Sequence, residues 1–114
     1  MAIVNGVSCA NTTVQDCRRY VQQRRNFATS NKQLYGYSIK RGDTVLYVVW
    51  SYGYHWPLFV YRDGVWFHNE DKYGPTTSKH HTKAHPHEDC HALSVTAIKR
   101  LVDGDFNVIS QVAA

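Results

Sequence analysis

The sequence of 114 residues has no long hydrophobic run, only three cysteines, and no acidic residue between positions 17 and 42. Without about 18 consecutive apolar residues, no segment is predicted to span a membrane. The three cysteines (Cys9, Cys17 and Cys90) are an odd number and provide no disulfide framework, which favours reduced thiols in a cytoplasm. The N-terminus lacks the basic and apolar regions of a secretory signal, so we expect a cytoplasmic location.

The composition is that of an ordinary globular protein, with 43% hydrophobic and 19% charged residues. No internal repeat, linker or low-complexity stretch divides the chain. A chain of this length can bury roughly two thirds of its unfolded surface, so residues 1–114 are predicted to form a single domain.

Positive charge is concentrated in residues 17–42, which hold seven lysines and arginines while the rest of the chain is slightly acidic. On the helix predicted for this region, Arg18, Arg19 and Arg25 fall on the outer side. Such segregation favours a partner that carries phosphate groups or an acidic surface. The alternative is a solvated helix face that contributes only solubility.

The hydrophobic pattern predicts an α+β fold, in which an N-terminal helix and a short C-terminal helix pack on an antiparallel meander of four or five strands. The N-terminal helix is expected at 13–28 and the C-terminal helix between Ser94 and Gly104. Residues 69–92 are polar and are interrupted by two prolines. The expected strands are 34–40, 44–52, 56–62 and 65–68, with a further edge strand over 106–112.

Aromatic residues are concentrated between Tyr35 and Tyr73, where twelve of the fifteen occur. A small sheet cannot bury so many rings, so some are expected at the surface. Tyr52 and Trp56 are candidates for stacking on single-stranded bases beside the basic helix. The same rings would also suit a protein interface or the core.

The most specific polar feature is the run Thr76-Thr77-Ser78-Lys79-His80. Pro75 prevents a strand from continuing through it, and Thr76 or Thr77 could cap a helical turn. A helix start offers free N–H groups, so these hydroxyls, Lys79 and His80 would form an anion cradle that Lys72 and Tyr73 could reach. A capped turn whose hydroxyls bond only to the local backbone is the alternative.

Other chemistry is also compatible with the sequence. A small phosphodiester-cleaving enzyme could use His80 as base with Ser78 or Thr77, or His68 paired with Glu70. Zinc could stabilise an interaction module through His87, Cys90 and His91, although no paired Cys-x-x-Cys knuckle is present. We expect no cofactor, and an imidazole-rich loop is the preferred interpretation of the histidines.

Two segments resemble a small domain family of unknown function found in phage and other mobile-element proteins. Its pattern is Y-S-Y-G followed by K-Y-x-x-T-T-S-[RK]-H, and the similarity covers roughly residues 45–82. His81 departs from the family, which usually has glutamine there. The resemblance implies a phage-type origin and a compact αβ module, and no established activity. The matching residues are Ser51, Tyr52, Gly53, Lys72, Tyr73, Thr76, Thr77, Ser78, Lys79 and His80.

These observations together predict a non-enzymatic, cytoplasmic binding protein of phage type. Its partner would be nucleic acid or a host complex that handles nucleic acid, and inhibition of bacterial defence, as by an anti-CRISPR protein, is one such role. The predicted binding residues come from the basic helix, the aromatic strands and the polar run: Arg18, Arg19, Arg25, Tyr52, Trp56, Lys72, Tyr73, Thr76, Thr77, Ser78, Lys79 and His80.

Overall fold

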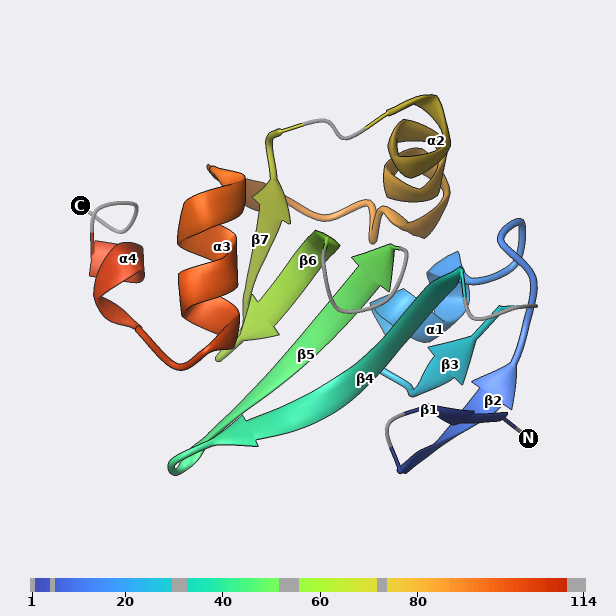
Figure 1. Cartoon of the computed structure of the whole chain (residues 1–114), viewed down its shortest axis with the longest axis horizontal. Helices are drawn as coiled ribbons and strands as arrows, with labels where there is room; N and C mark the ends of the chain where they lie inside the picture. The colour runs from blue at the N-terminus through green and yellow to red at the C-terminus, as the bar shows by residue number, and fades with distance from the viewer. Residues whose placement is uncertain (1, 5, 30–32, 52–55, 72–73, 111–114) are drawn as a thin grey trace.

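A computed structural model describes residues 2–4, 6–29, 33–51, 56–71 and 74–110. These residues form one eight-stranded sheet and four helices (Figure 1). In chain order the elements are β1 (Ala2–Val4), β2 (Val7–Asn11), α1 (Arg18–Gln22), β3 (Phe27–Ala28), β4 (Leu34–Arg41), β5 (Thr44–Ser51), β6 (Trp56–Arg62), β7 (Val65–Asn69), α2 (Pro75–Ala84), β8 (Cys90–Leu93), α3 (Val95–Val102) and α4 (Asn107–Ser110).

The strands lie side by side in the order of the sequence, β1 to β8. Strands β3 to β7 form an antiparallel meander, whereas the pairs β2–β3 and β7–β8 are parallel. The chain passes through α1 between the first parallel pair and through α2 between the second, as parallel strands require a crossover. The α+β class is therefore confirmed, but the predicted sheet of four or five antiparallel strands was too small.

The meander follows the predicted strands closely, and β6 has the predicted bounds. Residues 34–40, 44–52 and 65–68 were predicted within one residue of the observed ends of β4, β5 and β7. The turn between β6 and β7 contains Asp63 and Gly64 with φ of 48° and 83°. Two successive positive φ values are those of a tight hairpin turn, for which Asp-Gly is a favoured dipeptide.

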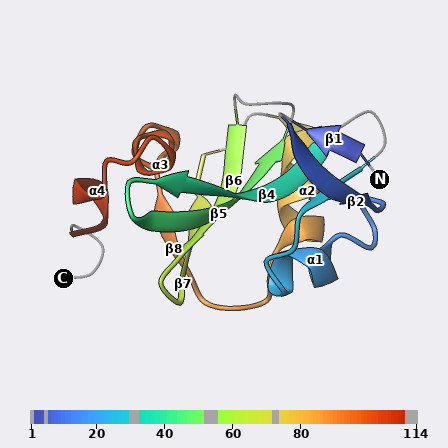
Figure 2. The same ribbon diagram turned by 90° about the horizontal axis from the view of Figure 1, so that it is seen from below.

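Helices cover both faces of the sheet (Figure 2). Leu46, Val48 and Trp50 of β5 belong to a cluster that contains the buried residues of α3. Tyr47 and Val49, between them in the sequence, belong to a second cluster with residues of α1 and α2. Because side chains alternate along a strand, an almost continuously apolar strand indicates burial on both faces, as predicted for β5.

The N-terminal helix is much shorter than the predicted 13–28. Thr13 caps a turn, in which the Asp16 amide donates to Thr13 Oγ1 at 3.1 Å. The helix ends at Gln22, and Arg24 then adopts a φ of 51° that turns the chain. Residues 27 and 28 leave the helical pattern because they pair with β4 instead.

The C-terminal half contains one confirmed helix and three differences from the prediction. Ser94 caps α3 as expected, its Oγ accepting from the Ala97 amide, and Gly104 follows the helix end with a φ of 101°. Residues 107–110 form α4, so the predicted edge strand over 106–112 is wrong for the residues that the structure describes. The polar stretch 69–92 contains α2 and β8, neither of which has an apolar pattern that would predict it.

Candidate functional site

The predicted anion cradle lies on the first two turns of α2, with Gly74 as N-cap and Pro75 in the first turn. Helical geometry divides the run between two faces. Thr76 and Lys79 are exposed, whereas Thr77 and His80 are each only 3% exposed and face the sheet. The structure therefore does not bring these side chains together on one accessible surface.

His80 attaches α2 to the sheet. Its Nδ1 lies 2.8 Å from the hydroxyl oxygen of Ser51, a buried residue at the end of β5. Burial, with a smaller contribution from the positive charge of Lys79, lowers the pKa of His80 from its usual 6.5. The folded protein thus favours a neutral imidazole at this position.

This pKa shift predicts a loss of stability on acidification. Below pH 6.5 the unfolded chain gains a proton at His80 that the folded protein takes up only at lower pH. The free energy of unfolding should therefore fall as the pH is lowered through 6.5, the pKa in the unfolded chain, and the loss due to His80 is complete below its lower pKa in the folded protein. Chemical denaturation in chelator-containing buffer across this range measures the slope.

The control for that measurement is His80→Gln, which should flatten the pH dependence, beside His91→Gln at an exposed position, which should not. A residual slope is expected because burial also lowers the pKa of His85. If the free energy of unfolding depended on pH equally steeply in the wild type and in His80→Gln, protonation of His80 would not be a cause of the acid destabilisation.

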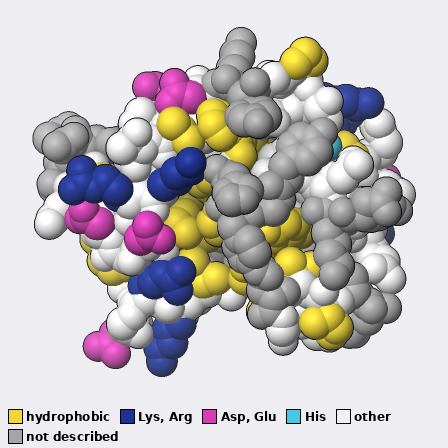
Figure 3. Space-filling model, viewed as in Figure 1, with side chains coloured by type: hydrophobic (Ala, Val, Ile, Leu, Met, Phe, Trp, Pro, Cys, Tyr) yellow, Lys and Arg dark blue, Asp and Glu magenta, His cyan; other side chains and the backbone are white. Residues whose placement is uncertain are grey.

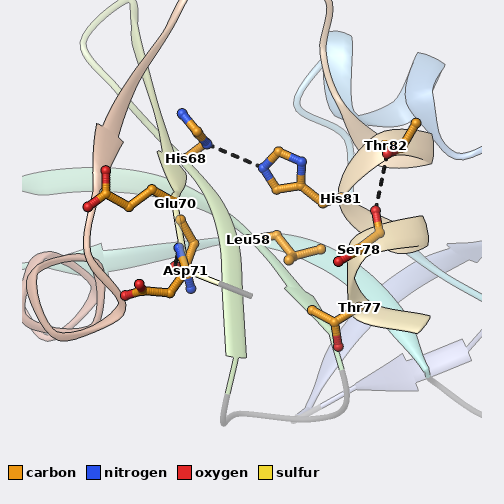
Figure 4. Close-up of a pocket in the computed structure, with 9 residues that line it drawn as sticks. Leu58, His68, Glu70, Asp71, Thr77, Ser78, His81 and Thr82 are labelled. Carbon is orange, nitrogen blue, oxygen red and sulfur yellow. Dashed lines mark hydrogen bonds between the residues drawn. The ribbon is translucent and has the colours of Figure 1, made fainter. Parts of the chain in front are cut away.

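A cavity of about 280 Å³ opens between the end of β7 and α2 (Figure 4). Leu58 is the additional residue of a β-bulge in β6 and contributes an apolar wall. Thr77 also lines the cavity, and its buried hydroxyl has no hydrogen-bond partner among the residues that the structure describes. The other lining residues are polar, and they come from β7 and the turn after it or from α2: His68, Asn69, Glu70, Asp71, Ser78, His81 and Thr82.

The guanidinium group of Arg18, in α1, forms hydrogen bonds within the protein. Its Nε donates to the carbonyl oxygen of His85 at 2.8 Å, and its Nη2 donates to that of Thr82 at 2.9 Å. Gln22, one turn further along α1, donates to the carbonyl oxygen of Pro86 at 3.0 Å. The last carbonyl groups of a helix have no partner within it, so Arg18 caps the C-terminal end of α2, and Gln22 holds the segment that follows it.

The other arginines of this region lie on tyrosine rings. The guanidinium groups of Arg19 and Arg25 lie 5.2 and 5.0 Å from the ring centre of Tyr20, and that of Arg24 lies 4.5 Å from the centre of Tyr61. All three arginines are exposed. Among the described residues, no carboxylate forms a salt bridge with them. We call these five residues the arginine–tyrosine surface.

The sequence identified only part of this surface. Arg19 and Arg25 were predicted binding residues, whereas Tyr20 and Arg24 were not. A local signal was present, because Arg19 and Arg25 flank Tyr20 closely along the chain. The contact between Arg24 and Tyr61 joins the turn after α1 to β6 and had no signal in the sequence.

The remaining predicted positions lie apart from this surface or outside the described residues. Trp56 is half-buried at the start of β6. Tyr52, Lys72 and Tyr73 lie outside the residues that the structure describes.

For the zinc hypothesis, the described part of the chain contains no group of three or more histidine, cysteine or acidic residues that could hold a metal ion. Cys90 and His91 are neighbours on β8, so their side chains project to opposite faces of the sheet.

Comparison of the chain with protein-family models, with curated proteins and with solved structures found no significant match. The resemblance to a phage domain family therefore stays a prediction. In the part of the chain that the structure describes, the helices are too short or too polar to cross a bilayer.

Proposed function

We propose that this protein binds nucleic acid through the arginine–tyrosine surface. The observation that carries the proposal is the placement of two exposed guanidinium groups, those of Arg19 and Arg25, over the single ring of Tyr20. A guanidinium that stacks on an aromatic ring keeps its N–H groups available at its edge. Those N–H groups match the geometry of a phosphate and can bind it in a bidentate manner.

The extent of the surface favours a polymer over a small anion. Arg24 and Tyr61 add a second arginine–ring pair beside the first, because Arg24 and Arg25 are adjacent in the chain. Several cations in a row can neutralise successive phosphates, and guanidinium planes held on tyrosine rings suit stacking of unpaired bases. Single-stranded nucleic acid is therefore the preferred ligand.

The opposite face of the sheet has a different charge pattern. Over α3 and its neighbours, basic and acidic side chains are intermixed (Figure 3). Arg100 and Asp105 form a salt bridge of 2.8 Å there, whereas Lys99 is exposed and forms no salt bridge within the described part of the chain. On the α1 side, by contrast, Arg19, Arg24 and Arg25 form no salt bridge within the described residues, and Asp16 is the acidic residue that precedes the helix. This excess of unpaired positive charge supports an oriented interaction.

In the cell, the same surface would bind nucleic acid directly or within a host complex that handles it. A phage-type origin, a cytoplasmic location and a role against bacterial defence belong to this proposal. They are supported by the sequence resemblance and by the basic segment 17–42. An inhibitor with net positive charge cannot imitate the negative charge of DNA. It would therefore have to bind nucleic acid or an acidic protein surface.

Arg19→Ala and Arg25→Ala are each expected to weaken binding to a labelled single-stranded oligonucleotide about 10-fold, since each removes a charge-assisted contact to phosphate. Each should also reduce the slope of log affinity against log salt by about 0.7, because one fewer counterion is released. Fluorescence anisotropy over a series of salt concentrations measures both quantities on DNA and RNA, single-stranded and duplex.

Lys99→Ala is the matched control, because it removes the same charge from the opposite face and should change affinity less than about 2-fold. Equal effects of Lys99→Ala and Arg19→Ala would show that net charge alone drives binding. Absence of binding to every probe at low salt would refute direct nucleic-acid binding and leave an acidic protein as the partner.

A further inference from the structure

Part of the sheet face that carries α1 and α2 has no helix over it in the described part of the chain. Both helices lie at the end of this face that is remote from the β4–β5 turn, as Figure 1 and Figure 2 show. At the other end, Lys40 of β4 and Val45 of β5 are exposed and pair with each other across the two strands. Val45 is 59% exposed. The uncovered part of the sheet therefore combines a positive charge with an apolar side chain.

The strand register shows that both side chains point to the side of the arginine–tyrosine surface. Tyr47 follows Val45 by two residues on β5, and Ser38 precedes Lys40 by two residues on β4, so each pair shares one face of the sheet. The Tyr47 hydroxyl donates to the carbonyl oxygen of Arg25 at 2.7 Å, which identifies this face as the one beneath the turn after α1. Lys40 and Val45 therefore lie beyond that turn and not behind the sheet.

The uncovered part of the sheet is continuous with the arginine–tyrosine surface. Tyr47 and Tyr61 are partners on β5 and β6, and the guanidinium group of Arg24 lies 4.5 Å from the centre of the Tyr61 ring. This row of residues thus lies beneath the turn that carries the arginines. Lys40 and Val45 form the next row toward the β4–β5 turn, two residues or about 7 Å further along the strands.

We propose that a single strand of nucleic acid bound at the arginine–tyrosine surface continues onto the uncovered part of the sheet. There the ammonium group of Lys40 binds a phosphate, and Val45 contacts a base or sugar. Lys40 forms no salt bridge within the described residues, and lysine binds phosphate as a point charge. This inference rests on the proposed function and adds to it a path across β4 and β5.

Acidic residues mark where the path ends. Asp43 lies in the β4–β5 turn and Asp63 in the turn after β6, and both are exposed. Asp63 lies 3.9 Å from the guanidinium group of Arg62, a distance at which little of its charge is neutralised. Negative charge at both turns disfavours phosphates there. The bound strand is therefore limited to the region between these two turns and the turn after α1, which predicts a site of limited length.

The test is fluorescence anisotropy of the full-length protein with labelled oligothymidine of about 4 to about 16 nucleotides, the range of site sizes of small single-strand-binding domains. Lys40→Ala should weaken binding of the longest probe about 5-fold, as expected for one exposed charge contact. It should also lower the slope of log affinity against log salt by about 0.7 for that probe. Arg19→Ala should weaken binding of every probe. The effect of Lys40→Ala should grow with probe length, because a short probe held by the arginines does not reach Lys40.

Val45→Glu and Val65→Glu are a matched pair, because both replace an exposed valine of a strand and add the same charge. Val65 precedes Phe67 by two residues on β7, and Phe67 belongs to the cluster that contains the buried residues of α3, so Val65 points to the opposite face. Val45→Glu should weaken binding of the longest probe at least about 5-fold, and Val65→Glu less than about 2-fold. Circular dichroism and thermal melting confirm that each variant is folded.

The path would be overturned, with the proposed function intact, if Arg19→Ala weakened binding while Lys40→Ala behaved like Lys99→Ala and Val45→Glu like Val65→Glu. An equal effect of Lys40→Ala on the shortest and the longest probe would also overturn it, because the bound strand would then not extend from the arginines to Lys40. Absence of binding to every probe would refute the proposed function, and the path with it.

Discussion

Gly36→Ala is expected to lower the free energy of unfolding by about 3 kcal/mol, the upper end of the range for overpacking in a core. A Cβ atom at this position would lie 2.7 Å from the Phe27 ring and 2.7 Å from the Tyr47 hydroxyl oxygen. Both rings are buried. Movement of the Tyr47 ring would cost a hydrogen bond, because its hydroxyl donates to the carbonyl oxygen of Arg25 at 2.7 Å.

Chemical denaturation of the variant and the wild type measures this difference. Ser38→Ala is the matched control, since Ser38 lies on the same strand and the same side of β4 but is exposed, and it should change stability by less than about 0.5 kcal/mol. A loss below about 1 kcal/mol for Gly36→Ala would mean that Phe27 and Tyr47 have room to shift.

This effect has a functional consequence as well as a structural one. Phe27 begins β3, directly after the turn that holds Arg24 and Arg25, and the Tyr47 hydroxyl binds the Arg25 carbonyl. Displacing either ring should disturb the arginine–tyrosine surface. The folded Gly36→Ala protein is therefore expected to bind nucleic acid more weakly than the wild type, although the substitution removes no charge.

Arg18→Ala is expected to cost about 2 kcal/mol of stability, because it removes two charge-assisted hydrogen bonds and leaves the carbonyls of Thr82 and His85 without their donor. In protein that remains folded, we expect its affinity for nucleic acid to change no more than that of Lys99→Ala. The physical reason is that the guanidinium is turned toward α2 rather than toward a ligand.

Arg19→Ala is the natural comparison, because the neighbouring arginine should show the opposite behaviour. It should change stability by less than about 0.5 kcal/mol while weakening binding about 10-fold. Thermal melting and anisotropy on the same preparations give both quantities. A large loss of affinity for Arg18→Ala at full stability would refute its assignment as a structural cap.

The meander was predictable because its signals are local. Alternating and continuously apolar strands are separated by turns whose residues permit positive φ, and Asp63-Gly64 adopts the expected conformation. The cap of α3 was equally visible, since Ser94 needs only the amide of Ala97, three residues away. In each case the residues that determine the structure are neighbours in the chain.

A helical turn was predicted at Thr76 or Thr77, but the length of α2 and its buried face had no such signal, because that face is formed by polar or small side chains. Thr77, His80 and Ala84 are spaced for one side of a helix, but hydropathy does not mark them as core residues. His80 is buried because Ser51, far away in the sequence, provides a hydrogen-bond partner for its ring. The run that resembled an exposed anion cradle is therefore divided between the surface and the core.

What the sequence determined by itself was the α+β class, most of the central strands and the concentration of positive charge in residues 17–42. The tertiary structure decided which arginines face outward, because Arg18 meets the end of α2 while Arg19 and Arg25 stack on Tyr20. It also brought His68 and His81 together across a cavity. These outcomes depend on contacts between segments distant in the chain, and neither hydrophobic periodicity nor charge spacing contains that information.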